Sequence, residues 1–401
     1  MAEATFSRTS LMAWTTVAVL GATLTVLGST PWPAVAMGAT ILALAQIVRV
    51  PTPSGHMLDV GLAVAAAVPL LTNDLYATGA IYSLGLLGSW IVLLGNRHRV
   101  STDFLPGVLA LTAYAFAFFG VMRRFEEASN LGEQSIQLAS ILAAGMAWFI
   151  AMALSTAVLR HRGERLAFRY LWLQALEDWS VVVGLVSAGA LFALSWPLMK
   201  WWAIPMAVMA YGFSHLAFVR YHGTRVTYSQ TIRALARIPE AAGLAPDGHA
   251  VRATDIAMAM GRELGMAPRE ASDLEFAALM HDIGRITLNE PAILKAGYSD
   301  EDIASWGAEI VKEAPYLNRV ATIIRQQHQP YRRPGEIVDE ELPLSSKVIR
   351  VASAYDQATL EMGLSPLEAI ETLHRGAAYD FDPEVVKALR RALVRAAVIA
   401  H

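Results

Sequence analysis

Cysteine is absent from this chain. Without thiols the protein has no disulfide bond, no thiolate zinc site, no iron–sulfur cluster and no thiol nucleophile. Charged residues are also scarce, at 17% of the 401 residues, whereas hydrophobic residues make up 55%. Such a composition excludes a soluble enzyme along the whole length of the chain. The net charge of −3 indicates no basic surface, so we expect no nucleic-acid polymer as a partner.

The charges that are present lie mainly in the second half. Residues 1–219 hold 11 Lys/Arg and 10 Asp/Glu, whereas residues 220–401 hold 21 and 25. We therefore predict a transmembrane helical domain at 1–219, an amphipathic linker helix at 220–240 and a helical domain at 241–401. The linker is predicted from Tyr228, Ile232 and Leu235, which recur at helical spacing. A signalling helix and a plain connector are both open for this segment.

Eight apolar runs in the first half are as long, or nearly as long, as a membrane span. They are Leu11–Gly28, Ala34–Val48, Met57–Leu71, Tyr76–Leu94, Phe104–Met122, Ile136–Leu159, Val181–Trp196 and Trp201–Val219. The third run is short and carries Asp59, so a count of seven stays open. Eight spans place most loop arginines on one side, which the positive-inside rule assigns to the cytoplasm. We expect a multi-pass protein of the cytoplasmic (inner) membrane with both termini in the cytoplasm.

Four ionisable residues lie in or at the edge of these runs: Asp59, Glu177, Asp178 and His215. Ionisable groups are costly inside a membrane and often functional there. They are compatible with a sensor pocket or an ion path, and equally with side chains that reach water at the ends of spans. A transporter with a regulatory tail is therefore a further alternative for the whole chain.

Helix start signals indicate that the second half is helical throughout. We expect Asp247 to cap the first helix, and Ser299 with Asp302 forms a pattern like a capping box. Ser365 and Asp382 each precede a proline, the preferred arrangement at a helix start. The sequence predicts an all-α protein, with a polytopic transmembrane helical domain followed by a cytoplasmic α-helical bundle.

A histidine and a carboxylate, His281 and Asp282, are adjacent within an apolar helical run. A buried ionisable pair usually needs a metal ion or a salt-bridge partner. Imidazole and carboxylate together suit Fe, Mn or Mg ions, which activate water and bind phosphate. The pair therefore predicts a divalent-metal site near the end of a helix.

The order His249, then His281-Asp282, then His328, followed by Lys347–Asp356, resembles the HD phosphohydrolase superfamily. The closing segment Phe381–Val386 is similar to its HD-GYP branch. The resemblance implies a helical domain that hydrolyses cyclic di-GMP at a centre of two or three metal ions, often behind a sensory or membrane module. It does not extend into the membrane half.

Residue by residue, the resemblance implies that His249, His281, Asp282 and His328 are metal ligands. It also implies catalytic roles for Asp282 and for Arg285, which replaces the lysine that follows the His-Asp-Ile-Gly motif. Arg285 either binds phosphate as a bidentate fork or forms a salt bridge with an acidic neighbour such as Glu290.

Several positions depart from the family pattern. Gln327 replaces a histidine, Ser353 replaces an aspartate ligand, and Ile303 stands where another histidine is expected. The Gly-Tyr-Pro segment is reduced to Tyr331–Pro334, and Asp356 is taken as structural. Because the loss of even an outer-shell partner weakens metal binding, we expect a single divalent ion if any, with water completing its shell.

These observations favour a membrane-anchored, HD-GYP-like phosphodiesterase with a degenerate site, acting on cyclic di-GMP or a related nucleotide. The alternative is a catalytically inactive domain that binds a nucleotide and relays a membrane signal. The sequence leaves a homodimer open.

Overall fold

The computed structural model describes residues 8–52, 57–93, 100–128, 132–164, 167–289, 297–333 and 335–399. In these ranges the helices are joined by turns and loops, and the named strands are one short antiparallel pair, β1 (Arg49–Pro51) and β2 (Met57–Asp59). The predicted all-α class is confirmed. Contacts divide the chain into two compact units, Met1–Glu164 with Gln174–Gly223, and Arg165–Leu173 with Thr224–His401.

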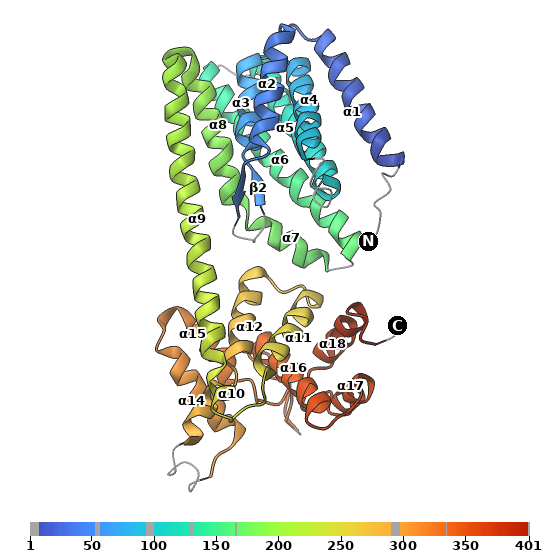
Figure 1. The fold of residues 1–401 in the computed structure, drawn as a ribbon, viewed down its shortest axis with the longest axis vertical. Helices are drawn as coiled ribbons and strands as arrows, with labels where there is room; N and C mark the ends of the chain where they lie inside the picture. Colours follow the sequence, from blue (N-terminus) through green and yellow to red (C-terminus); the bar gives the residue numbers. More distant parts are fainter. Residues whose placement is uncertain are drawn as a thin grey trace. The chain divides into compact units, whose positions relative to one another are not determined.

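The first unit is a bundle of apolar helices (Figure 1). Its helices are α1 (Arg8–Leu27), α2 (Trp32–Ala45), α3 (Gly61–Thr72), α4 (Leu75–Leu93), α5 (Val100–Ala128), α6 (Glu133–Glu164) and α8 (Trp179–Met199). The short helix η1 (Lys200–Trp202) follows, and then α9 (Ala203–Ala236) begins. Helix α7 (Phe168–Leu176) falls across the residue ranges of the two units.

Three helical stretches are long and apolar enough to cross a membrane: Leu105–Glu127, Glu133–Gly163 and Trp179–Ala217. The third contains a break at Lys200, whose φ of 48° ends α8. The predicted count of eight spans is not confirmed, because the remaining apolar helices are shorter.

The third predicted run shows the largest difference from expectation. Met57–Asp59 is the strand β2, and α3 has 12 residues, which is about 18 Å against about 30 Å of hydrocarbon. Within α3, Pro69 lacks an N–H and leaves the carbonyl of Ala65 without its helical donor. The Tyr82 hydroxyl donates to that carbonyl at 2.6 Å, so α3 is stabilised by a neighbouring helix.

The ionisable residues singled out in the first half lie at the ends of elements or pair locally. Asp59 ends β2 opposite Arg49, and Asp178 directly precedes the first residue of α8. Within α9, the Tyr211 hydroxyl lies 3.4 Å from His215 Nδ1.

Helix α9 continues without interruption from Ala203 to Ala236. The residues predicted as a separate linker helix, 220–240, therefore belong to the end of α9 and to the short helix α10 (Ile238–Ala241). Ile232 and Ala236 are buried in the core of the second unit, so the last turns of α9 are an integral part of that unit.

The second unit contains the remaining helices. They are α11 (His249–Glu263), α12 (Pro268–Met280), η2 (Ile283–Asn289), α14 (Asp300–Lys312), η3 (Pro315–Leu317), α15 (Asn318–Arg325), α16 (Leu344–Leu360), α17 (Pro366–Arg375) and α18 (Pro383–Arg395).

Most of the predicted caps of these helices are confirmed. Side chains of Ser299, Ser365 and Asp382 each accept a hydrogen bond from a backbone N–H in the first turn of their helix. The expected cap at Asp247 is wrong. Gly248 is the residue before α11, with φ of 72°, and the carbonyl of Asp247 accepts a hydrogen bond from the Arg252 side chain instead.

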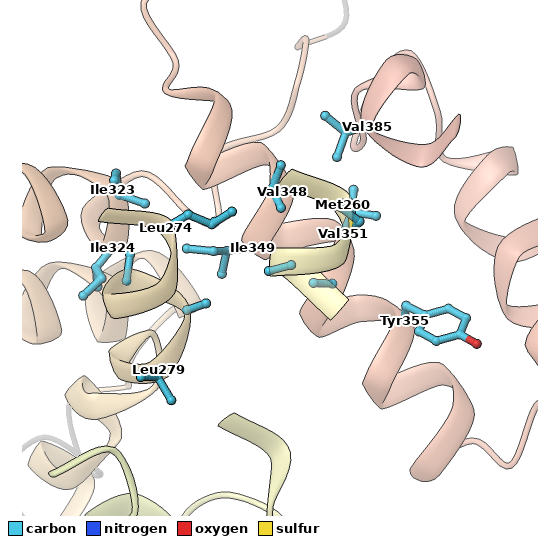
Figure 2. Close-up of a cluster of buried hydrophobic side chains, with 14 of the residues drawn as sticks. Met260, Leu274, Leu279, Ile323, Ile324, Val348, Ile349, Val351, Tyr355 and Val385 are labelled. Atoms are coloured by element: carbon cyan, nitrogen blue, oxygen red, sulfur yellow. The ribbon is translucent and has the colours of Figure 1, made fainter. Parts of the chain in front are cut away.

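Helix α16 supplies much of the core of the second unit. Val348, Ile349 and Val351 are buried and pack with Met260 of α11 and Leu274 of α12 (Figure 2). Burial of aliphatic side chains of this size contributes about 1.5–3 kcal/mol each. The packing fixes α11 and the end of α12 relative to α16. His249 begins α11, and His281 directly follows α12.

The start of η2 is held against α14 by two glycines. A methyl group on Gly284 would lie 2.0 Å from the carbonyl oxygen of Ile303 and 2.7 Å from the N atom of Gly307. Because both contacts are with backbone, neither can be relieved by a side-chain rotation. Glycine is therefore required here, two residues after Asp282.

Replacing Gly284 by Ala should destabilise the second unit at the upper end of the about 1–3 kcal/mol typical of overpacking, or more. The matched control is Gly223→Ala in α9, where a methyl group meets no atom within 4 Å. Thermal unfolding of the purified full-length protein measures both. Equal melting temperatures for the two variants would contradict the close contact at Gly284.

Candidate metal centre

Three buried side chains meet where α11 begins and α12 ends. His249 is the first residue of α11, His281 directly follows α12, and Asp282 precedes η2. His281 and Asp282 both approach His249 at the point where α12 ends. The Nε2 atoms of the two histidines are 3.2 Å apart. Asp282 Oδ2 lies 3.6 Å from His281 Nε2 and 3.8 Å from His249 Nε2.

Hydrogen bonds at the other ring nitrogens define the tautomers of both histidines. Nδ1 of His281 lies 2.8 Å from the carbonyl oxygen of Ala278, which can only accept, so this nitrogen carries the proton. Nδ1 of His249 lies 2.7 Å from Asp356 Oδ2 and donates in the same way. Burial lowers the pKa of His281 more than Asp282 raises it, which keeps the imidazole neutral with a lone pair on Nε2.

Asp282 is ionised although it is buried. Burial disfavours its charged form, but the positive charge of Arg285 and its hydrogen bond to the carboxylate outweigh that effect and lower the pKa of the carboxyl group. The Nε of Arg285 donates to Oδ1 at 2.7 Å. Among the residues that the structure describes, Oδ2 has no hydrogen-bond partner. A buried acceptor without a donor is costly, so Oδ2 marks a place for a cation or a bound proton.

The three atoms therefore fit a divalent metal ion. Two imidazole nitrogens and one carboxylate oxygen form the 2-His-1-carboxylate donor set found at Fe and related ions. Within the described residues, His249, His281 and Asp282 are the group whose ligand atoms lie close enough together, within 4.8 Å of one another. A proton shared between the two Nε2 atoms is the other way to satisfy the cluster.

Asp356 has a positioning role that was not expected from the sequence. Its carboxylate accepts from His249 Nδ1 and from Nε and Nη2 of Arg252, at 2.9 and 3.2 Å. Metal-binding histidines commonly donate their second ring nitrogen to such a carboxylate, which fixes the ring and raises its basicity. Asp356 thus orients His249 although it lies 107 residues away in sequence.

His328 is not part of this cluster. It is half-buried, and its carbonyl accepts a hydrogen bond from Arg350. Burial lowers the pKa of His328, and the charges of Asp300, His281, Arg350 and Asp282 act on it too. The residue is thus near the three-residue group without contributing an atom to it.

The residues that replace family ligands lie around the cluster. Ser353 Oγ is 3.3 Å from His249 Nε2, and Gln327 Nε2 donates to the carbonyl of His281 at 2.8 Å. Ile303 is buried, and its carbonyl lies against Gly284.

Arg285 pairs with Asp282, whereas Glu290, the other partner considered from the sequence, lies outside the described residues. The guanidinium group is partly exposed, and its other N–H donors extend beyond the contact with Asp282. A salt bridge to an acidic neighbour is therefore observed, with Asp282 as the partner, and phosphate binding by Arg285 stays a prediction.

Tyr331 and Arg332, which begin the segment that stands in place of Gly-Tyr-Pro, form backbone hydrogen bonds with the turn before α18. The N–H groups of Tyr331 and Arg332 donate to the carbonyls of Asp380 and Tyr379, and the Arg332 guanidinium lies 4.8 Å from the centre of the Tyr379 ring. Tyr331 and Arg332 therefore pack against the turn before α18.

Comparison with known proteins agrees with the geometry. Residues 233–385 match the HD domain family. The chain is 26% identical over 181 residues to the cyclic di-GMP phosphodiesterase response regulator RpfG of Xanthomonas campestris pv. campestris (strain 8004). That alignment covers 40% of this chain and 47% of the relative, so the chain spans about half the length of the curated relative that it matches. No solved structure matches the chain.

The matched range contains His249, His281 and Asp282 as well as Ser353 and Asp356. All three residues of the cluster therefore lie within the part of the chain that matches the family. Residues 233–385 of this chain are an HD domain.

Proposed function

We propose that this protein is a membrane-anchored, metal-dependent phosphohydrolase whose HD domain cleaves a phosphodiester, in cyclic di-GMP or a related nucleotide. The observation that carries the proposal is the buried Asp282 Oδ2, which has no donor among the described residues and lies beside two Nε2 atoms. The substrate class is supported by the name of the relative, a cyclic di-GMP phosphodiesterase.

The donor set supports one ion, of Fe, Mn or Mg, bound by His249, His281 and Asp282. Ser353, Gln327 and Ile303 stand where further ligands are expected, and a hydroxyl, an amide and an alkyl chain are poor substitutes for imidazole or carboxylate. We retain His328 as a proposed fourth ligand only if its side chain moves toward the cluster, because it is not part of the present group.

Residues of this chain orient the proposed ligands and bind the phosphate. When bound, a divalent ion supplies Lewis-acid polarisation of a phosphoryl oxygen and activation of water. Asp356 holds the ring of His249, and the Ala278 carbonyl holds that of His281. Arg285 neutralises part of the charge of Asp282 and presents its other N–H donors to the phosphate, where negative charge develops during cleavage.

The same proposal includes the location of the protein. Three helical stretches are long and apolar enough to span a bilayer, and the loop arginines favour a cytoplasmic position for both termini. A multi-pass protein of the inner membrane would place the HD domain where it meets cytoplasmic nucleotides.

A second candidate function is a nucleotide-binding domain without turnover that relays a membrane signal. It is favoured by Ser353, whose hydroxyl lies 3.3 Å from His249 Nε2. A hydroxyl donating to that nitrogen satisfies its lone pair without a metal ion. The two candidates differ in whether the cluster binds a dication.

The first test is hydrolysis of cyclic di-GMP by the purified full-length protein with Mn²⁺. The wild type should cleave the nucleotide. Asp282→Asn, which keeps the shape and removes the charge, should reduce turnover by about 100-fold or more, since even outer-shell partners are worth about 10–100-fold.

The control for this test is Asp255→Asn, which removes a carboxylate on the exposed side of α11 and should leave turnover unchanged. Binding of cyclic di-GMP without cleavage, equal in wild type and Asp282→Asn, would contradict the phosphohydrolase and support the relay domain.

A second test addresses the orientation of His249. Asp356→Asn removes the charge that faces Nδ1 of His249 and should weaken Mn²⁺ binding by about 10–100-fold, measured by electron paramagnetic resonance of free Mn²⁺. Asp339→Asn, at an exposed loop carboxylate, serves as the control. A dissociation constant within about twofold of the wild type would show that Asp356 does not act on the metal site.

A further inference from the structure

A carboxylate from outside α11 accepts a hydrogen bond at the start of that helix. Oε1 of Glu240, in α10, accepts from the backbone N–H of Ala250 at 3.1 Å. Ala250 directly follows His249, the first residue of α11, and both residues are buried. Glu240 thus holds the backbone beside one of the three clustered residues.

The start of α11 has no side-chain cap from the residue that precedes it. That residue is Gly248, which has no side chain to accept from the N–H groups of the first turn. These N–H groups have no partner within the helix, and helix ends fray. His249 lies where fraying would begin, so the cap that Glu240 supplies restrains a proposed ligand of the ion.

His249 is therefore held at two points. Asp356 accepts from Nδ1 of the ring, and Glu240 holds the peptide that follows the residue. A carboxylate suits the second task, because the N-terminus of a helix carries partial positive charge. The bond to Asp356 fixes the ring, whereas the bond from Ala250 to Glu240 fixes the backbone from which the ring projects.

The position of Glu240 is set by the segment that follows α9. Ile232 and Ala236, in the last turns of α9, are buried in the core of the second unit, and Pro239 of α10 is buried as well. Helix α10 also packs against η2, which begins directly after Asp282. The connector therefore contacts the chain next to His249 and next to Asp282.

We propose that Glu240 is a positioning residue of the metal site, through which the connector at the end of α9 acts on His249. This assignment rests on the metal site proposed above. Of the two alternatives for residues 220–240, it favours a signalling segment over a plain connector. A movement of α10 that withdraws Glu240 from Ala250 loosens the turn that presents His249 and weakens binding of the ion.

The test is the affinity of the purified full-length protein for Mn²⁺, measured by electron paramagnetic resonance of the free ion. Glu240→Leu removes the acceptor and should weaken binding by about 10-fold, the lower end of the range for outer-shell partners. Glu240→Gln keeps an oxygen acceptor at the same place and should bind Mn²⁺ within about twofold of the wild type.

The matched control is a carboxylate that caps the other helix next to the cluster, at its distant end. Oε2 of Glu270 accepts from the backbone N–H of Ala267 at 3.0 Å, at the start of α12, whereas His281 follows the end of that helix. Glu270→Leu should lower the melting temperature and leave the Mn²⁺ affinity unchanged.

Melting temperatures of the metal-free variants separate positioning from plain helix capping. A plain cap predicts a lower melting temperature for Glu240→Leu with wild-type Mn²⁺ affinity, and that result overturns the assignment. Equal weakening by Glu270→Leu overturns it too, because the effect would then follow the loss of any cap. If Glu240→Leu does not fold, Glu240→Asp decides. It withdraws the carboxylate by one methylene group, and an unchanged affinity overturns the assignment.

Failure of the two proposals can be told apart. Wild-type protein that binds no Mn²⁺ overturns the metal site itself and the assignment of Glu240 with it. Wild-type protein that binds Mn²⁺ normally, with Glu240→Leu unchanged, overturns only the assignment.

Discussion

Mutual repulsion of buried lone pairs is the constraint on which the site depends. His249 Nε2, His281 Nε2 and Asp282 Oδ2 lie between 3.2 and 3.8 Å from one another, and the other ring nitrogen of each histidine already donates elsewhere. Acceptors at such distances repel unless a cation or a proton lies between them. The surrounding fold must therefore hold the three groups together against this repulsion.

The scaffold around the cluster supplies that restraint. Packing of α16 against α11 and α12 places Asp356 within hydrogen-bond distance of Nδ1 of His249. The contact between Gly284 and α14 fixes the backbone that follows Asp282, and Arg285 offsets part of its charge. These restraints come from α11, α12, α14, α16 and η2, so the arrangement belongs to the folded domain and not to any one segment.

The sequence could predict the all-α class, the helix starts at Ser299, Ser365 and Asp382, and the candidate residues of the site. Those features depend on local signals, such as a side chain reaching a backbone N–H two or three residues ahead. The proximity of His249 to His281-Asp282 could be predicted only from the resemblance to a family, because His249 and His281 are 32 residues apart in the sequence.

Other features could not be predicted because they depend on tertiary contacts. Nothing in the local sequence of Asp356 shows that its helix packs beside His249. The amide of Gln327 is oriented by the carbonyl of His281, 46 residues away. Hydropathy likewise did not reveal that Met57–Asp59 pairs as a strand with Arg49–Pro51, because apolar runs of that length are ambiguous between strand and helix.

The central claim is that the two Nε2 atoms and Asp282 Oδ2 bind one metal ion. Electron spin-echo envelope modulation of the Mn²⁺-loaded full-length protein tests it most directly, because the method detects nitrogen atoms bonded to the ion. We predict modulation from two imidazole nitrogens, reduced to one in His281→Ala. A spectrum of Mn²⁺ surrounded only by oxygen, identical in wild type and His281→Ala, would contradict the claim.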